Sequence, residues 1–124
     1  MTEFVAAVLV HVADVDAGLS WYQRAFPSAE RRRLDAFDFE YLKIGSTHLE
    51  IVPADEKVAS GAAGSVVYWQ VEDFDRALAD FNGLGAPLYR GPLAIEDGLW
   101  MCQVRDPWGN CIGLRGPRGG QETA

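Results

Sequence analysis

The sequence runs His11-Val-Ala-Asp-Val-Asp-Ala-Gly-Leu-Ser-Trp-Tyr22, and 59 residues later it runs Gln70-Val-Glu-Asp-Phe-Asp-Arg-Ala-Leu-Ala-Asp-Phe81. When the two stretches are aligned, both aspartates and most of the apolar positions coincide. Further along, Leu49-Glu-Ile51 corresponds to Ile112-Gly-Leu114 at a separation of 63 residues, which implies a small insertion. Because an internal repeat defines the unit of a fold, we predict two similar units of about sixty residues each.

Both units predict the same order of elements. An apolar strand, at Phe4–Val12 and again at Val66–Val71, leads to an aspartate that can cap a helix. The caps are Asp14 and Asp73, and apolar residues then recur at helical spacing. Three strands are expected after each helix, at 30–35, 37–44 and 47–53 in the first unit and at 87–93, 99–105 and 110–115 in the second. The sequence therefore predicts the α+β class, with two βαβββ modules.

The module boundaries follow from composition. We expect one domain over residues 2–116, made of modules 2–58 and 65–116 and joined by a Gly- and Ser-rich linker at 59–64. Residues 117–124 are expected to form a flexible tail. With 124 residues, 48% of them hydrophobic, the chain can bury a core without a metal or disulfide staple.

Charge and composition limit the kinds of binding partner and the cellular location that we expect for the protein. The formal net charge of −7 argues against nucleic acid or an anionic membrane as a partner. No apolar run approaches the roughly 18 residues of a membrane span. Met1-Thr2-Glu3 lacks the basic start of a signal peptide, so we expect a cytoplasmic protein. Cys102 and Cys111 have no metal-type spacing and are expected to be reduced.

The duplicated βαβββ pattern resembles the vicinal oxygen chelate superfamily, which contains glyoxalase I, bleomycin-resistance proteins and extradiol dioxygenases. The residues that carry the resemblance are Asp14, Trp21-Tyr22 and Asp106-Pro107-Trp108-Gly109-Asn110. It covers about residues 2–116. The resemblance implies curled mixed sheets around a cavity (a glyoxalase-like fold), and it also implies a homodimer.

Metal-using members of that superfamily take ligands from the first and last strand of each unit. The resemblance assigns these positions to Ala7, Glu50, Val66 and Gly113, of which only Glu50 has a donor side chain. Divalent cations need several oxygen or nitrogen donors, so we expect neither a divalent metal nor another cofactor. A relocated metal site built from His11, His48 and Glu50 stays open as an alternative.

Strand alternation predicts which side chains line the cavity. We assume a tight pairing around residues 106–109, which sets Trp100 opposite Arg115, Cys102 opposite Gly113 and Val104 opposite Cys111. Flat aromatic rings would stack on a planar or cationic ligand, and charged groups would fix its orientation. The candidate ligand-binding residues are His11, His48, Glu50, Tyr68, Gln70, Trp100 and Arg115.

These expectations lead to three hypotheses about function. The first is a metal-free, non-enzymatic protein of the bleomycin-resistance type that sequesters an aromatic or cationic small molecule. The second is an enzyme of the glyoxalase type, a lyase, isomerase or dioxygenase, in which Glu50 acts as a base or binds a relocated metal. The third is an accessory module that acts through the dimer alone.

Overall fold

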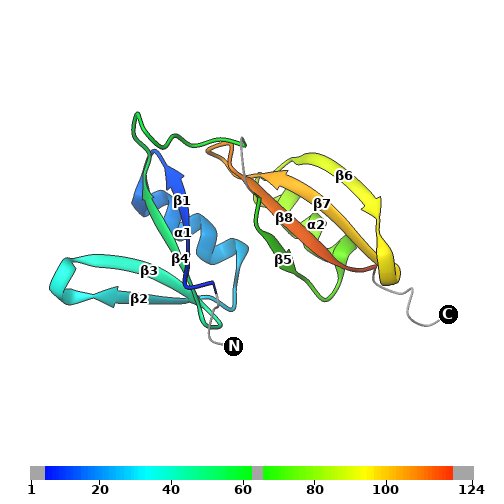
Figure 1. Cartoon of the computed structure of the whole chain (residues 1–124), viewed down its shortest axis with the longest axis horizontal. Helices are drawn as coiled ribbons and strands as arrows, with labels where there is room; N and C mark the ends of the chain where they lie inside the picture. The colour runs from blue at the N-terminus through cyan, green and yellow to red at the C-terminus, as the bar shows by residue number, and fades with distance from the viewer. Residues whose placement is uncertain (1–4, 63–65, 119–124) are drawn as a thin grey trace. The chain divides into compact units, whose positions relative to one another are not determined.

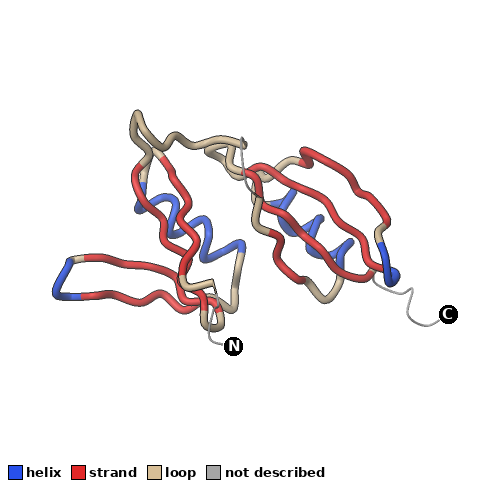
Figure 2. Tube along the Cα trace, viewed as in Figure 1, coloured by secondary structure: helices blue, strands red, loops and turns tan. Residues whose placement is uncertain are grey.

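The computed structural model describes residues 5–62 and 66–118. The chain divides into two compact units, Met1–Ser60 (unit 1) and Gly61–Ala124 (unit 2), and each is described by itself. Each unit holds one long helix and one four-stranded mixed sheet (Figure 1 and Figure 2). The α+β class and the two βαβββ modules are therefore confirmed.

Unit 1 follows the predicted order of elements. It contains β1 (Ala7–Val12), α1 (Val15–Ala25), β2 (Glu30–Leu34), the short 3₁₀ helix η1 (Asp35–Phe37), β3 (Phe39–Ile44) and β4 (Thr47–Pro53). The strand order is β1-β4-β3-β2, with β1 and β4 parallel and the other pairs antiparallel. The carboxylate of Asp14 accepts the backbone N–H of Ala17 at 3.1 Å, so the predicted cap is confirmed.

Helix α1 covers one face of the unit 1 sheet. Leu19 and Tyr22 are buried on the helix, and Val12, Leu49 and Ile51 are buried on the strands. In Figure 1 the β2–β3 hairpin projects beyond α1, and all five residues of β2 are exposed. Below, the face of each sheet that its helix does not cover is called the open face.

Unit 2 repeats the arrangement. It contains β5 (Tyr68–Gln70), α2 (Phe74–Gly83), β6 (Leu88–Ala94), the short 3₁₀ helix η2 (Glu96–Gly98), β7 (Leu99–Arg105) and β8 (Cys111–Pro117). The strand order is β5-β8-β7-β6, with β5 and β8 parallel. Asp73 accepts the N–H of Arg76 at 3.1 Å, as its repeat partner does in unit 1.

The expected pairing of the last two strands was wrong by one residue. In the structure Trp100 pairs with Gly116, Met101 pairs with Arg115, and Cys102 pairs with Leu114. The connection holds five residues, 106–110, because Asp106 bonds to the backbone of Asn110 as well as that of Trp108. A one-residue change of register turns every side chain to the other face.

Two strand ends also differ from expectation. Strand β5 begins only at Tyr68, whereas β8 continues past Arg115 to Pro117, into the range predicted to be a flexible tail. The following residue, Arg118, is ion-paired with Asp75 of α2 at 3.0 Å. Residues 63–64 of the expected linker, residue 65 at the start of the second expected module, and residues 119–124 of the expected tail lie outside the described residues.

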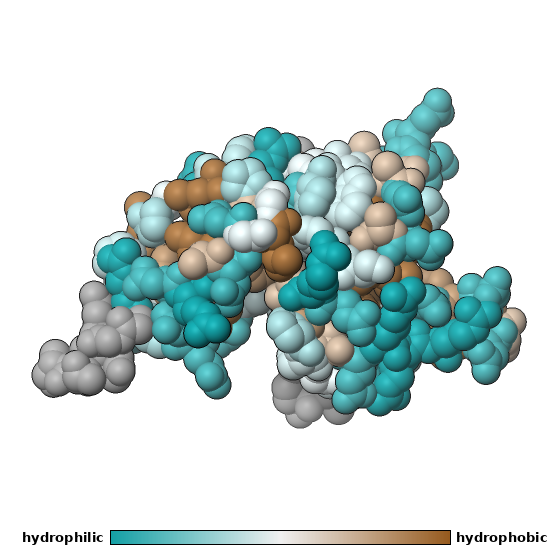
Figure 3. Space-filling view, turned by 180° about the vertical axis from the view of Figure 1, so that it is seen from behind, coloured by the Kyte–Doolittle hydropathy of each residue, from teal (hydrophilic) through white to brown (hydrophobic). Residues whose placement is uncertain are grey.

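Among residues 5–62 and 66–118, no helix combines the length and the apolar character needed to cross a bilayer. On the face drawn in Figure 3, hydrophobic residues are interspersed with hydrophilic ones.

Candidate functional site

The open face of unit 1 carries three of the predicted site residues. The register pairs Ala7 with His48, Leu9 with Glu50, and His11 with Val52, so all six side chains lie on one face. The opposite face holds the buried Leu49 and Ile51. The predicted sharing of one face by His11, His48 and Glu50 is thus what the structure shows.

An aromatic contact on this face was not predicted. Tyr41 of β3 stacks on the imidazole of His48, with ring centroids 4.3 Å apart. Tyr41 stacks in turn with Phe39 at 6.2 Å. The alternation of β3 offered a signal for this cluster, but the partner strand had to be known before His48 could be placed beside it.

Glu50 differs from most other charged residues of unit 1 in its bonding. Its carboxylate has no hydrogen-bond or ion-pair partner in the described part of the chain, and it is partly exposed. The three arginines Arg31, Arg32 and Arg33 are instead paired with nearby carboxylates on β2, β3 and η1. The described residues also contain no group of three or more His, Cys, Asp and Glu side chains able to hold a metal ion. His11, His48 and Glu50 accordingly do not form a three-donor cluster in unit 1.

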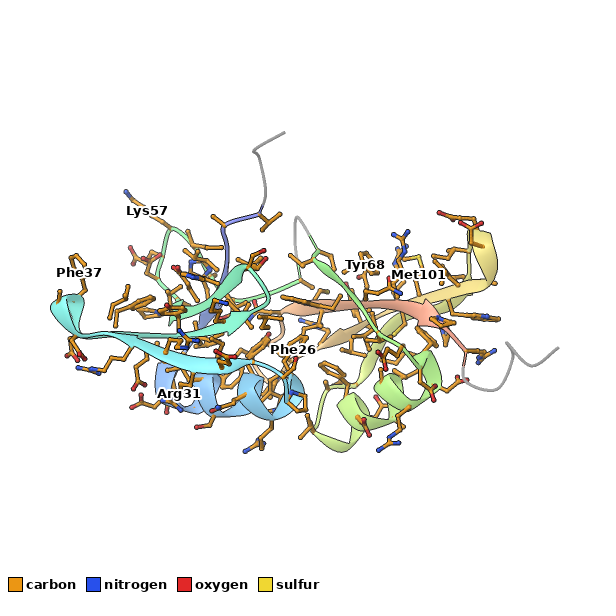
Figure 4. The ribbon with its side chains drawn as sticks, turned by 90° about the horizontal axis from the view of Figure 1, so that it is seen from below. Phe26, Arg31, Phe37, Lys57, Tyr68 and Met101 are labelled. Atoms are coloured by element: carbon orange, nitrogen blue, oxygen red, sulfur yellow. The ribbon has the colours of Figure 1, made fainter. Side chains whose placement is uncertain are left out.

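The open face of unit 2 is organised around Tyr68. A side chain at Gly113 would begin 2.5 Å from the Tyr68 ring, so the ring occupies the space that the missing side chain leaves. The Tyr68 hydroxyl accepts a hydrogen bond from Gln103 Nε2 at 2.8 Å, which fixes the ring across β8. Figure 4 shows Tyr68 and Met101 on the side of the sheet away from α2.

Arginines flank this aromatic surface. Arg115 pairs with Gln70 on β5 and with Met101 on β7, and Arg90 of β6 pairs with Gln103. Neither Arg90 nor Arg115 has an ion-pair partner among the described residues, and both are exposed. The sequence placed Tyr68, Gln70 and Arg115 on one face, as the structure does, but did not indicate that Gln103 and Arg90 lie there too. Bulges in β6 break the alternation that would have indicated Arg90.

Trp100 does not join the other predicted site residues of unit 2. It lies on the α2 face of the sheet, and the guanidinium of Arg118 stacks over its ring at 4.0 Å. The prediction that Trp100 lies opposite Arg115 was therefore wrong. The connection between β7 and β8 is one residue longer than assumed, and this shifts the pairing by one position.

The four positions that the resemblance assigns to metal ligands do not fit a divalent cation. Ala7 and Val66 carry no donor atom, and the ring of Tyr68 covers Gly113. Glu50 alone supplies an oxygen, which is fewer donors than a protein-bound divalent ion takes. The correspondence of these positions with the ligands of the family remains a prediction from the resemblance.

Unit 1 also contains a small open cavity that the sequence did not indicate. Its volume is about 260 Å³, below the usual range for ligand pockets. Its only guanidinium, from Arg33, is already paired with Asp35, Asp38 and Glu40. The cavity lies on the α1 side of the sheet, away from the predicted site residues. The lining residues are Val15, Asp16, Leu19, Arg33, Asp38, Phe39, Glu40 and Ile51.

Both cysteines are free, as expected. Cys102 is buried beneath α2, and burial raises the pKa of its thiol to about 11. Burial also raises the pKa of the Cys111 thiol, while the charge of Arg105 acts in the opposite direction. Both thiols are thereby kept in the neutral form near pH 7, so neither is an activated nucleophile.

Comparison with known proteins decides the family. The sequence model of the Glyoxalase/Bleomycin resistance protein/Dioxygenase superfamily matches residues 5–114. The chain belongs to this superfamily. A comparison with curated proteins gave no match.

Solved structures of the superfamily share the fold. A member from Sphaerobacter thermophilus has a TM-score of 0.73 at 17% identity, over 92% of this chain and 97% of its own. A family enzyme from Burkholderia phytofirmans has a TM-score of 0.72 at 17% identity, over 90% and 96%. A lactoylglutathione lyase from Agrobacterium tumefaciens has a TM-score of 0.67 at 17% identity, over 92% and 93%. Likeness at this level of identity shows the fold.

Proposed function

We propose that this superfamily member is a small-molecule-binding protein that holds an aromatic compound without a divalent metal and without changing a bond. The observation that carries the proposal is the ring of Tyr68, which fills the space beside Gly113 and is held by Gln103. The position that the family resemblance gives to a metal ligand thus presents a flat aromatic surface, and such surfaces bind planar ligands by stacking.

The aromatic groups of unit 1 support the same proposal. Tyr41 and His48 form a stacked pair, and the side chains of Leu9 and Val52 stand on the same face. Apolar and aromatic side chains with few polar groups are the usual lining of a small-ligand site. Binding of this kind is sufficient for sequestration.

Binding by the Tyr68 ring is tested with 2-naphthol as a planar probe, titrated while intrinsic tryptophan fluorescence is recorded. We expect saturable binding that the Tyr68→Ala variant weakens about tenfold, since a stacking contact on a partly buried aromatic ring is worth about 1 kcal/mol or more. The exposed Tyr89→Ala variant is the matched control and should bind as the wild type does. Equal affinity of the wild type and Tyr68→Ala would contradict the proposal.

An enzyme of the glyoxalase type is the second candidate. One observation favours it: the Glu50 carboxylate has no partner in the described chain and faces the open side of the sheet, as a general base must. Elemental analysis of protein purified without chelators separates the two candidates. Stoichiometric zinc, nickel, iron or manganese that is lost in Glu50→Gln would favour the enzyme, and protein without metal would favour the binding protein.

A further inference from the structure

The open face of unit 2 has an unequal distribution of charge. Three arginines, Arg90, Arg105 and Arg115, lie on the strand positions of this face, and none of its positions on β5 to β8 is an aspartate or glutamate. The whole chain nevertheless carries 18 acidic and 11 basic residues. The strand positions of the covered face also lack carboxylates, but they carry no arginine, so the excess of positive charge lies on the open face alone.

The register places these groups in adjacent rows. One row across the sheet holds Tyr68, Gly113, Gln103 and Arg90, and the next row holds Gln70, Arg115, Met101 and Leu93. Rows on one face are about 7 Å apart, and neighbouring strands are about 4.8 Å apart. An arginine side chain spans such distances, so both guanidinium groups can reach the margin of the Tyr68 ring.

Arg90 and Arg115 differ from most other arginines of the described chain in their lack of a side-chain bonding partner. Arg31, Arg32, Arg33, Arg76 and Arg118 each have a carboxylate partner. Arg105 donates from Nε to the carbonyl of Gly109 at 3.1 Å and stacks over Tyr89, so it belongs to the connection between β7 and β8. Arg90 and Arg115 have no such partner among residues 5–62 and 66–118, and their charges are available to a ligand.

We propose that the open face of unit 2 binds a planar organic anion, whose ring stacks on Tyr68 and whose carboxylate is bound by Arg115 and Arg90. The proposal rests on the proposed function, because it assumes that the ligand is a small aromatic compound, and it adds the charge of that ligand. A guanidinium donates two parallel N–H groups to a carboxylate, which gives both strength and orientation. Met101 and Leu93 supply the apolar surface beside the ring.

The test compares three ligands that share one ring system: 2-naphthoate, 2-naphthalenemethanol and 2-naphthylmethylammonium. Their dissociation constants for the wild type are measured by isothermal titration calorimetry at low and at high salt. We expect naphthoate to bind about tenfold or more tightly than the neutral compound, because hydrogen bonds to charged groups contribute that much. The affinity for naphthoate should fall as salt rises, and the affinity for the neutral compound should stay constant.

Variants assign the effect to the two arginines. Arg115→Gln and Arg90→Gln should each weaken naphthoate binding by about three- to tenfold and leave the neutral compound unaffected, whereas Arg115→Lys should retain part of the preference. Arg24→Gln is the matched control, because Arg24 is also exposed and forms no ion pair with another described residue, but lies on α1. Circular dichroism establishes that each variant is folded.

The outcomes separate this inference from the proposed function. If all three ligands bind with equal affinity, or if Arg115→Gln and Arg90→Gln bind naphthoate as tightly as the wild type, the anion preference is overturned and the binding function stands. If none of the three binds, both are overturned. If the two variants change the sedimenting mass but not naphthoate binding, the face is a contact between protein chains and the inference is overturned.

Discussion

Gly113 is the residue on which the aromatic surface of unit 2 depends. Its ideal Cβ position lies 2.5 Å from Cδ1 and 2.8 Å from Cε1 of Tyr68, well inside contact distance. We therefore expect Gly113→Ala to displace the ring and break its hydrogen bond with Gln103. The free energy of unfolding, measured in urea, should fall by about 1–3 kcal/mol, and 2-naphthol binding should weaken.

Two further variants control this prediction. A Cβ at Gly83 would meet nothing within 4 Å, so Gly83→Ala should leave stability unchanged or raise it by up to about 1 kcal/mol. The double variant Gly113→Ala with Tyr68→Ala should be more stable than the sum of the single effects, because the clash needs both side chains. If the two changes in the free energy of unfolding simply add, the side chain at position 113 does not clash with the Tyr68 ring.

The buried thiol of Cys102 is expected to lower the free energy of unfolding at alkaline pH. Burial raises the pKa of its thiol from 9.0 to about 11, which means that the folded protein favours the neutral form. This contribution to stability is complete below pH 9 and is lost as the pH rises through about 11, since the unfolded chain releases the proton more easily. Urea unfolding between about pH 8 and about pH 11 should show a falling free energy of unfolding.

Comparison of two variants isolates the effect of the Cys102 thiol from the effects of the other side chains. Cys102→Ala should show a shallower fall than the wild type. Cys111→Ala should keep most of the fall, because Cys111 is only partly buried. Parallel pH profiles for Cys102→Ala and the wild type would refute the assignment.

At the scale of elements, helix α1 lies close to its sheet at Gly18. A Cβ there would meet Ile51 Cγ2 at 2.7 Å and Val12 Cγ2 at 3.0 Å, and all of these residues are buried. The repeat partner of Gly18 in α2 is Ala77, so the two helices do not have the same requirement. Gly18→Ala should lower the free energy of unfolding by about 1–3 kcal/mol despite the better helix propensity of alanine.

The sign of the Gly18→Ala effect is the informative result. Gly83→Ala, at the end of α2, gives the change expected from helix propensity alone. A stabilised Gly18→Ala variant would mean that α1 has room to move away from β1 and β4, and that the close approach is not required.

The sequence predicts elements that rest on local chemistry and fails where one residue decides a long-range pairing. Asp14 and Asp73 cap their helices through their own third neighbours, so the pattern alone was enough. The pairing of β7 with β8 depends on the carboxylate of Asp106, which is 3% exposed and bonds to both Trp108 and Asn110. Those bonds lengthen the connection to five residues and move Trp100 to the α2 face.

In the candidate site, too, local alternation was predictable from the sequence and an irregular strand pairing was not. Alternation placed His48 and Glu50 on one face of β4 and Tyr68 on the face of Gly113, and the structure agrees. Arg90 could not be found in this way, because the register shifts around Gly91 and Pro92 put Arg90 and Leu93 on the same face at an odd spacing. A pattern of period two has no means of showing a bulge.

At the scale of the whole molecule, each unit covers only one face of its sheet with its own helix. The open face of unit 1 carries apolar side chains, and Leu9 among them is 52% exposed. Leaving such side chains in water costs free energy, which association of chains recovers. Together with the family resemblance, this leads us to predict a homodimer.

Sedimentation equilibrium at micromolar concentration should therefore give twice the mass of the chain. Leu9→Glu places a charge on an open face and should shift the equilibrium toward single chains, since an unpaired charge resists burial. Val58→Glu is the matched control, because Val58 is similarly exposed, at 46%, but lies in the loop after β4. A single-chain mass for the wild type would contradict the homodimer. Loss of the dimer in Val58→Glu as well would show that added negative charge, on a chain that already carries −7, is responsible rather than the open face.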